Sequence, residues 1–289
     1  MVANFTERLC NAHGCCIAQY LVARTVLSLV CLLFIGTQFA FAQSPGTVFL
    51  DDLTWTELRD QIQSGKTTII IPIGGTEQNG PAMALGKHNV RAKFLSEKIA
   101  LALGNALVAP VIAYVPEGSV TPPTQHMRFP GTITVPDATF EAVLESAARS
   151  FKLHGFRDIV LLGDHGGYQS DDRAVADRLN REWAGTSVRV HALDEYYRVT
   201  QADYVQALES KGYAEKEIGT HAGLADTSLM LAVDPSMVRT DKLQSGDELG
   251  SLDGVYGNPR RASAALGQIG VDMIVSETVD AINKAVRRH

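Results

Sequence analysis

Cysteine occurs only near the start of this 289-residue chain, at Cys10, Cys15, Cys16 and Cys31. All four precede position 43, where we expect the mature protein to begin. The 247 residues that remain of 289 after the first 42 therefore offer no thiol for disulfide bonds, metal binding or nucleophilic catalysis. A metal site in this chain would have to use histidine nitrogen and carboxylate oxygen.

The expected start at Gln43 rests on a secretory leader. Arg24 precedes an apolar run over residues 26–35, and Ala40-Phe41-Ala42 supplies the small residues that signal peptidase reads. The run is shorter than a membrane-spanning helix requires. The sequence thus predicts a signal peptide over residues 1–42, no stable membrane insertion after cleavage, and an exported protein, periplasmic or secreted. An uncleaved N-terminal anchor is the alternative.

Basic clusters and several well-known catalytic motifs are also missing. The formal net charge is −6, and it becomes −7 without the leader, which carries one more base than acid. Such a chain is a poor partner for nucleic acid or anionic membranes. It lacks the Gly-x-Ser-x-Gly elbow of serine hydrolases, the phosphate loop and the Gly-x-Gly-x-x-Gly dinucleotide fingerprint. A small-molecule substrate is the expected partner.

Short apolar runs alternate with amphipathic stretches, a pattern typical of parallel strands joined by helices. The expected strands are 67–73, 106–114, 158–162 and 187–193, and the expected helices are 90–103, 137–154, 169–183, 226–233 and 271–288. No repeat or linker interrupts them, and residues 43–289 are enough for one well-buried core. The sequence predicts one α/β domain with a mostly parallel central sheet.

Four loops carry the polar residues that could perform chemistry. In open α/β sheets, ligands bind beyond the carboxyl ends of the strands. A glycine turn follows the first strand, a long segment follows the second, and a Gly-Asp-His-Gly-Gly turn follows the third. The polar candidates in the four loops are Glu77 with His88, His126, Asp164 with His165, and His221 with Asp226.

Glutamate, aspartate and histidine without cysteine are the donors expected for Zn²⁺, Mn²⁺ or Fe²⁺ in a hydrolytic site, where the metal lowers the pKa of water to about 7. Glu77 and His165 directly follow apolar strands and glycines, which favours a site over a surface or core role. Structural alternatives stay open for other positions: His126 could brace its loop, and His221 could cap a helix.

These segments resemble the creatininase (creatinine amidohydrolase) family over about residues 49–285. The matching segments are Leu53-Thr54-Trp55, Pro72-Ile73-Gly74, Glu77-Gln78-Asn79-Gly80, Phe129-Pro130-Gly131-Thr132, Asp164-His165-Gly166-Gly167, His221-Ala222-Gly223 and Asp226 to Leu231. The resemblance implies a three-layer α/β fold and a metal-dependent hydrolase. It also implies a substrate with a cyclic or other non-peptide amide bond, and a homo-oligomer.

The resemblance implies that Glu77 and His165 bind metal and that His221 transfers protons. Other positions depart from the family. Asn79 stands where relatives have a ligand histidine, His88 where they have an aspartate that bridges two metals, and Gly167 where creatininase has a ligand glutamate; Leu224 and Asp226 also differ. A carboxylate can bridge two cations, whereas a neutral imidazole offers one lone pair to one metal. These departures argue against two metals.

We therefore predict one divalent ion, zinc first with manganese or iron as alternatives, bound by Glu77, His88 and His165 with one position open for water. The predicted catalytic residues are His221, Asp226 and Asp164. The residues assigned to substrate binding or to support of the ligands are Asn79, His126, Gly166 and Gly167. One alternative is a hydrolase whose metal site is shifted to use Asp164 or His126, and another is an inactive member kept for binding or assembly.

Overall fold

The computed structural model describes residues 46–244 and 249–287. The predicted leader, residues 1–42, lies outside the described residues and stays a prediction. Within the described ranges, none of the helices has both the length and the apolar character needed to cross a membrane.

The described part of the chain contains one sheet of four parallel strands in the order β2-β1-β3-β4. The strands are β1 (Thr68–Ile73), β2 (Ala106–Val108), β3 (Asp158–Gly163) and β4 (Arg189–Ala192). All six residues of β1 are buried, as expected for a central strand covered on both faces. Ile73 pairs with Gly163, so the loops after β1 and β3 leave the sheet side by side.

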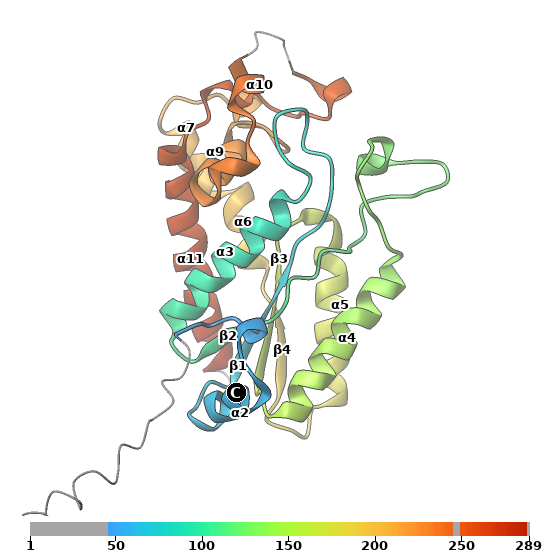
Figure 1. The fold of residues 1–289 in the computed structure, drawn as a ribbon, viewed down its shortest axis with the longest axis vertical. Helices are drawn as coiled ribbons and strands as arrows, with labels where there is room; N and C mark the ends of the chain where they lie inside the picture. Colours follow the sequence, from blue (N-terminus) through green and yellow to red (C-terminus); the bar gives the residue numbers. More distant parts are fainter. Residues whose placement is uncertain (1–45, 245–248, 288–289) are drawn as a thin grey trace, which may run out of the picture. The chain divides into compact units, whose positions relative to one another are not determined.

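Helices cover both faces of this sheet (Figure 1). One face carries α3 (Lys87–Leu103), α6 (Asp194–Gln201), α7 (Asp203–Glu209), α9 (Leu224–Val233) and α11 (Ala264–Val286). The other carries α2 (Trp55–Gln63), α4 (Asp137–His154) and α5 (Gln169–Glu182). Two short helices, α8 (Glu215–Ile218) and α10 (Thr240–Gln244), lie in the connections around α9.

Two hydrophobic cores fill the space between the sheet and its helices. Alternate residues of a strand point to opposite faces, so Ile70 joins the core under α3 and α11 whereas Ile69 and Ile71 join the core under α4 and α5. The predicted α/β fold with a parallel central sheet and three layers is confirmed.

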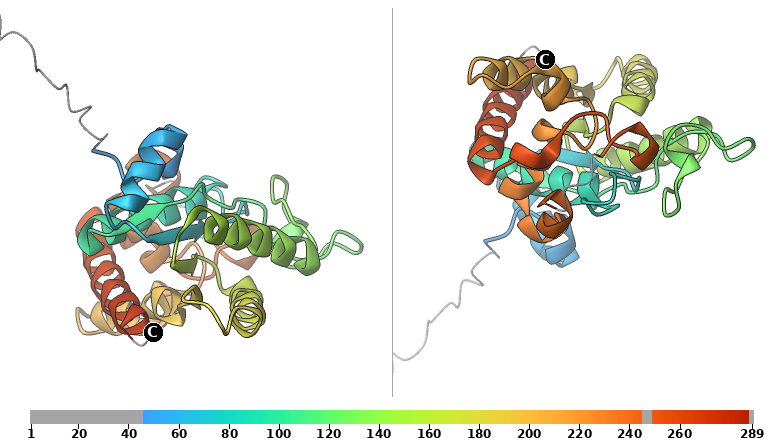
Figure 2. Two further views of the ribbon diagram at one scale, coloured as in Figure 1. Left: turned by 90° about the horizontal axis from the view of Figure 1, so that it is seen from below. Right: turned by 90° about the horizontal axis from the view of Figure 1, so that it is seen from above.

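The second strand differs from its expected length of 106–114. It ends at Val108 because Pro110 has no N–H to donate to a sheet ladder. An isolated bridge between Ile73 and Ile112 keeps the following segment beside β1. The chain then runs through a long connection to α4, which reaches out on the side away from α11 in both views of Figure 2. This connection begins at the carboxyl end of the sheet and contributes to the site below.

Candidate metal centre

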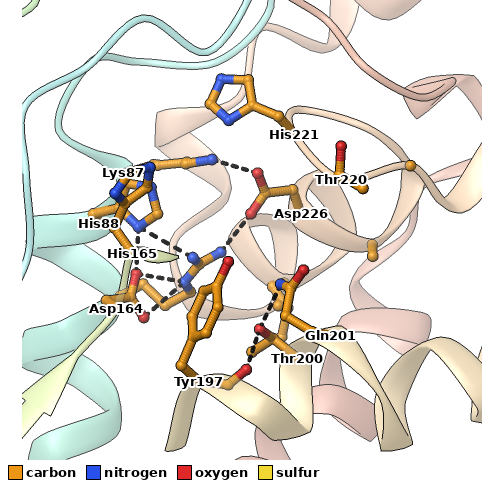
Figure 3. A pocket seen from close by; sticks show the side chains of 14 residues that line it. Lys87, His88, Asp164, His165, Tyr197, Thr200, Gln201, Thr220, His221 and Asp226 are labelled. Atoms are coloured by element: carbon orange, nitrogen blue, oxygen red, sulfur yellow. Dashed lines mark hydrogen bonds and ion pairs between the residues drawn. The ribbon is translucent and has the colours of Figure 1, made fainter. Parts of the chain in front are cut away.

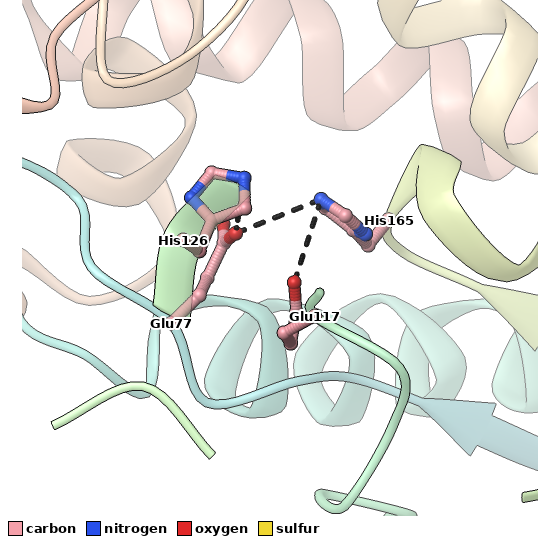
Figure 4. Close-up of side chains that lie close together, drawn as sticks. All are labelled: Glu77, Glu117, His126 and His165. Carbon is pink, nitrogen blue, oxygen red and sulfur yellow. Dashed lines mark ion pairs between the residues drawn. The ribbon is translucent and has the colours of Figure 1, made fainter. Parts of the chain in front are cut away.

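Four side chains gather beyond the carboxyl ends of the strands: Glu77, Glu117, His126 and His165 (Figure 4). Each can offer one donor atom, and these four atoms all lie within 4.8 Å of one another. Both glutamates are buried and both histidines are partly buried. Two carboxylates and two imidazoles at this spacing are a donor set suited to a divalent transition metal.

A glycine turn after β1 makes room for the two carboxylates. Gly75 has φ +149°, and a Cβ there would lie 2.6 Å from Oε1 of Glu117. The Gly75 N–H donates to Asn89 Oδ1 at 3.0 Å, which fixes the turn against α3. Glu117 can therefore lie against the backbone that leads into Glu77 only because residue 75 has no side chain.

His126 is held by the Phe-Pro-Gly-Thr segment that follows it. Thr132 Oγ1 donates to the His126 carbonyl at 2.9 Å and accepts the N–H of Gln78 at 3.1 Å. Gln125, immediately before His126, has φ +48°, an uncommon conformation for a residue with a side chain. Such strain persists only where the surrounding structure determines it, and here it presents His126 to Glu77.

His165 follows β3 directly and points at both carboxylates. Its Nδ1 accepts the N–H of Gly167 at 3.1 Å. Its Nε2 lies 3.6 Å from Glu77 Oε2 and 3.9 Å from Glu117 Oε2. With Nδ1 acting as acceptor, a neutral ring carries its proton on Nε2, so binding of a metal through Nε2 must displace that proton.

Three of the four carboxylate oxygens of the group have no hydrogen-bond partner. Glu77 Oε2 and both oxygens of Glu117 make no hydrogen bond, although His126 Nε2 lies 3.1 Å from Glu77 Oε2. Burial and the neighbouring Glu77 raise the pKa of Glu117 to about 9. Buried polar atoms are rarely left unpaired in folded proteins. A divalent cation would give a partner to one oxygen of each glutamate, so the residues fit a metal.

Both histidines of the group are neutral, as metal ligands must be, and the proton on Nε2 of His165 has to move before that nitrogen can bind. Burial lowers the pKa of His165 to about 3, and burial also lowers the pKa of His126. Both rings are therefore neutral at physiological pH. A neutral imidazole has the lone pair that a metal ligand needs.

His88, the third ligand expected from the sequence, lies behind Glu77 and outside this group. Its Nε2 is 2.7 Å from Glu77 Oε1 and its Nδ1 is 2.6 Å from Asp164 Oδ2. Because each ring nitrogen of His88 already faces a carboxylate, neither nitrogen is available to bind a metal beside the unpaired oxygens. The structure thus brings together Glu77 and His165 from the predicted set and joins them to His126, which matches the alternative of a shifted site.

The predicted catalytic carboxylates are engaged in ion pairs (Figure 3). Arg91 Nε donates to Asp164 Oδ2 at 2.9 Å, and Arg91 Nη1 donates to Asp226 Oδ1 at 2.6 Å. Lys87 binds the other oxygen of Asp226. Burial raises the pKa of both carboxyls, but the neighbouring cations outweigh it and hold both pKa values below their usual range. Weakly basic, fully paired carboxylates suit positioning better than proton transfer.

His221 lies beside Oε1 of Glu77, the oxygen that His88 and Lys87 also approach, and one of its ring nitrogens makes no hydrogen bond. Its Nε2 lies 2.9 Å from the carbonyl oxygen of Gln78 and 3.1 Å from the side-chain nitrogen of Gln78; we take the shorter contact as the hydrogen bond, which puts the proton on Nε2. Its Nδ1 lies 3.7 Å from Glu77 Oε1. Burial and Lys87 lower the pKa of His221 to about 4. The ring is therefore neutral near pH 7, with the lone pair of Nδ1 directed into the site.

Three further predicted residues shape the loops. Asn79 donates to the backbone carbonyls of Glu77 and Ala84, at 2.9 and 3.1 Å, and so braces its own loop. Gly167 supplies the N–H that orients His165. A Cβ on Gly166 would lie 2.5 Å from the Tyr197 hydroxyl, so glycine allows that ring to approach. All three residues lie around the site and hold its loops and side chains in position.

Glu117 is the residue that sequence reasoning missed. It lies in the long connection after β2 with no helix or strand around it, and so reads as an ordinary loop carboxylate. One signal was present: the apolar Val115 and the flanking Pro116 and Gly118 place it just past a strand at the carboxyl edge of the sheet. Glu77 was predicted by the same rule, that ligands bind beyond the carboxyl ends of the strands.

Comparison with known proteins agrees with this fold. Residues 51–282 match the family described as "Creatininase: Creatinine amidohydrolase". The chain is 29% identical to "Creatinine amidohydrolase" of Pseudomonas putida over 202 residues, 68% of this chain and 76% of the relative. It is 26% identical to "Mycofactocin precursor peptide peptidase" of Mycolicibacterium smegmatis over 254 residues, 81% of this chain and 90% of the relative.

Solved structures give the same result. A crystal structure of creatinine amidohydrolase (creatininase) superimposes with a TM-score of 0.69 at 25% identity, covering 83% of this chain and 98% of that one. Other creatininase structures are described as of Zn-Zn type or as containing Mn. The family match covers well over half of the chain, and the fold and the candidate centre accord with it. This protein therefore belongs to the creatininase family of metal-dependent amidohydrolases.

Proposed function

We propose that this protein hydrolyses an amide C–N bond with one divalent metal ion held by Glu77, Glu117, His126 and His165. The observation that carries this proposal is the set of three unpaired, buried carboxylate oxygens that face two neutral imidazoles. Zinc is our first choice, with manganese or iron as alternatives, because nitrogen and oxygen donors suit all three.

A bound ion would supply Lewis acidity and lower the pKa of a water molecule. The protein's part in the reaction falls to His221. Its neutral Nδ1 accepts the proton of the attacking water, and the same nitrogen returns that proton to the departing amide nitrogen. Gln78 fixes the ring by accepting Nε2–H through its backbone carbonyl. Ala222, next in the chain, has φ +52°, so a strained backbone helps to aim the imidazole.

The substrate would bind in the cavity between His165 and His221, which is also lined by charged side chains such as Lys87 and Asp226; of the four proposed ligands, only His165 borders it (Figure 3). Tyr197, Thr200 and Thr220 offer hydroxyl groups there. Such a wall suits a small polar amide, whether cyclic, as in the substrate named for the creatinine amidohydrolase relative, or the end of a peptide, as in the name of the peptidase relative. A cyclic or other non-peptide amide remains our first choice.

The competing hypothesis is an inactive member that keeps the fold for binding or assembly. It was favoured by the loss of family ligands at Asn79, His88 and Gly167. Glu117 and His126 restore the number of donors to four, and His221 keeps a free nitrogen. These residues favour the enzyme.

Metal analysis and an amidase assay on the same samples test the proposal. Purified protein should contain close to one Zn, Mn or Fe per chain by plasma mass spectrometry. Chelation should abolish the hydrolysis of at least one member of a panel of creatinine, hydantoins and short peptides, and metal should restore it. His221→Gln should keep the metal and lower kcat about a hundredfold or more. Protein that stays inactive with metal bound would favour the binding module.

Export and self-association are proposed alongside this activity. A periplasmic or secreted location follows from the predicted leader, and N-terminal sequencing of the mature protein should begin at Gln43. A homo-oligomer follows from the family resemblance. Light scattering on the purified protein would test it, and a monomer at micromolar concentration would contradict it.

A further inference from the structure

Glu77 and five ionisable side chains behind it form a closed ring in which acidic and basic residues alternate. Three of them, Lys87, His88 and Arg91, belong to the first turns of α3. The other three are carboxylates from separate parts of the chain. In order around the ring they are Glu77, His88, Asp164, Arg91, Asp226 and Lys87, which returns to Glu77.

Every link but one is a hydrogen bond. His88 bridges Glu77 and Asp164, Arg91 bridges Asp164 and Asp226, and Lys87 binds Asp226. The ring closes through Lys87 Nζ, which lies 3.6 Å from Glu77 Oε1. Lys87 is 1% exposed, although lysine is among the residues least often buried.

The ring occupies one oxygen of Glu77 and leaves the other outside. Oε1 faces His88 and Lys87, whereas Oε2 has no hydrogen-bond partner and faces the candidate metal centre. Within the ring, both oxygens of Asp164 and both oxygens of Asp226 accept hydrogen bonds. Each carboxylate oxygen of Asp164 and Asp226 therefore already has a partner supplied by the protein.

We propose that two basic side chains of α3, Lys87 and Arg91, are a built-in substitute for a second cation, so that the site takes one divalent ion and excludes another. This inference rests on the proposed metal centre. Buried carboxylates so close together need positive charge to remain ionised. Here the chain itself provides that charge, and a second metal ion beside Glu77 would meet Lys87 and Arg91 at short range in a poorly screened environment.

Lys87 is the ring member to test, because its charge can be removed while its hydrogen bond is kept. Lys87→Gln retains a donor for Asp226 but no charge. Lys87→Arg retains the charge. Lys98→Gln removes an exposed lysine from the same helix and serves as the matched control. Circular dichroism and thermal melting verify that each variant folds.

Mn²⁺ binding, followed by electron paramagnetic resonance and calorimetry, gives a readout that needs no substrate. We expect one Mn²⁺ in the wild type, in Lys87→Arg and in Lys98→Gln. In Lys87→Gln we expect the first ion to bind about tenfold more tightly, because a nearby positive charge is gone, and a second ion to bind at higher concentration. If Lys87→Gln does not fold, Lys87→Met removes the same charge without leaving a buried amide and should also admit a second ion.

The outcomes separate the two proposals. One ion with unchanged affinity in Lys87→Gln would overturn the ring proposal and leave the metal centre intact. Two ions in the wild type would also overturn the ring proposal without harming the proposed hydrolase. A wild-type protein that binds no Mn²⁺ or Zn²⁺ would overturn the metal centre, and the ring proposal with it.

Discussion

The two oxygens of Glu77 lie in two different environments. On the side of Oε1, every carboxylate oxygen of Asp164 and Asp226 has a hydrogen-bond partner, and acids and bases alternate. On the side of Oε2, the oxygens of Glu117 have no partner, and neutral imidazoles face them. Both sides are buried, so burial alone does not separate them.

The difference shows which polar groups hold the protein together and which are kept ready for a ligand. A satisfied network rigidifies a core, whereas a partly satisfied one costs free energy unless something binds it. The ring therefore acts as the support that fixes the orientation of Glu77. On the Oε2 side, binding of a metal would offset the free-energy cost of the unpaired oxygens.

The largest effect should come from breaking the ring at Arg91, which bridges two buried carboxylates. Arg91→Met leaves Asp164 and Asp226 without their shared partner, so we expect the free energy of unfolding to fall by about 3–5 kcal/mol. Urea denaturation of the metal-free protein measures it. Arg173→Met removes an arginine whose pair with Asp194 is about half-exposed, and should cost less than about 1 kcal/mol. Equal losses of unfolding free energy in the two variants would show that the buried ring stabilises the protein no more than an exposed ion pair does.

On the Oε2 side of Glu77, removing an ionisable group should increase stability instead of lowering it. Glu117→Gln removes a carboxylate whose folded pKa, about 9, exceeds its unfolded value. Folding of the wild type must take up a proton at pH 7, so this group costs stability increasingly as pH rises from about 4.5 to about 9. The metal-free variant should therefore melt at a higher temperature than the wild type.

The same variant should bind metal about a hundredfold more weakly, because one ligand carboxylate is gone. Calorimetry with Zn²⁺ gives the affinity, and Glu209→Gln, an exposed glutamate on α7, is the control. A variant that melts lower and binds Zn²⁺ as well as the wild type would show that Glu117 is structural.

The same physics explains what the sequence could predict. Local sequence patterns were sufficient to predict the fold. The isoleucine run of β1 and the glycines after β1 and β3 place Glu77 and His165 at one edge of a parallel sheet. Topology alone therefore identified two of the four donors. His126 was recognised as a candidate only because its loop follows the second predicted strand.

The roles of His88 and Glu117 depend on contacts between distant segments. His88 meets Asp164 across 76 positions of sequence, and nothing near residue 88 reveals that both ring nitrogens are occupied. Glu117 gains its place from Gly75, whose missing side chain makes room for it. Whether such a side chain can bind a metal depends on which hydrogen-bond partners it already has, and these partners are known only from the folded structure.

Metal affinity should rise with pH, a smaller effect that again separates the two sides. Glu117 is protonated below about pH 9 without metal, and a metal can bind only its deprotonated form. We expect Zn²⁺ affinity to increase about tenfold per pH unit between pH 6 and 8, with release of about one proton at pH 7. Calorimetry in buffers of different ionisation enthalpy measures the release. The slope should become shallower in Glu117→Gln; an unchanged slope would assign the proton to another group.

The smallest expected effect concerns an unpaired carboxylate that is not part of the four-residue group. Asp172, on α5, is buried and its Oδ1 has no hydrogen-bond partner. Burial raises its pKa well above the usual value, so the folded state holds a proton that the unfolded chain releases above about pH 4, and stability falls as pH rises. No imidazole of the centre accompanies it, so we assign it no ligand. Asp172→Asn should raise the free energy of unfolding by about 1 kcal/mol and the melting temperature by about 2–4 °C, with Zn²⁺ affinity unchanged. A loss of Zn²⁺ affinity in this variant would mean that unpaired carboxylates outside the four-residue group also belong to the metal site.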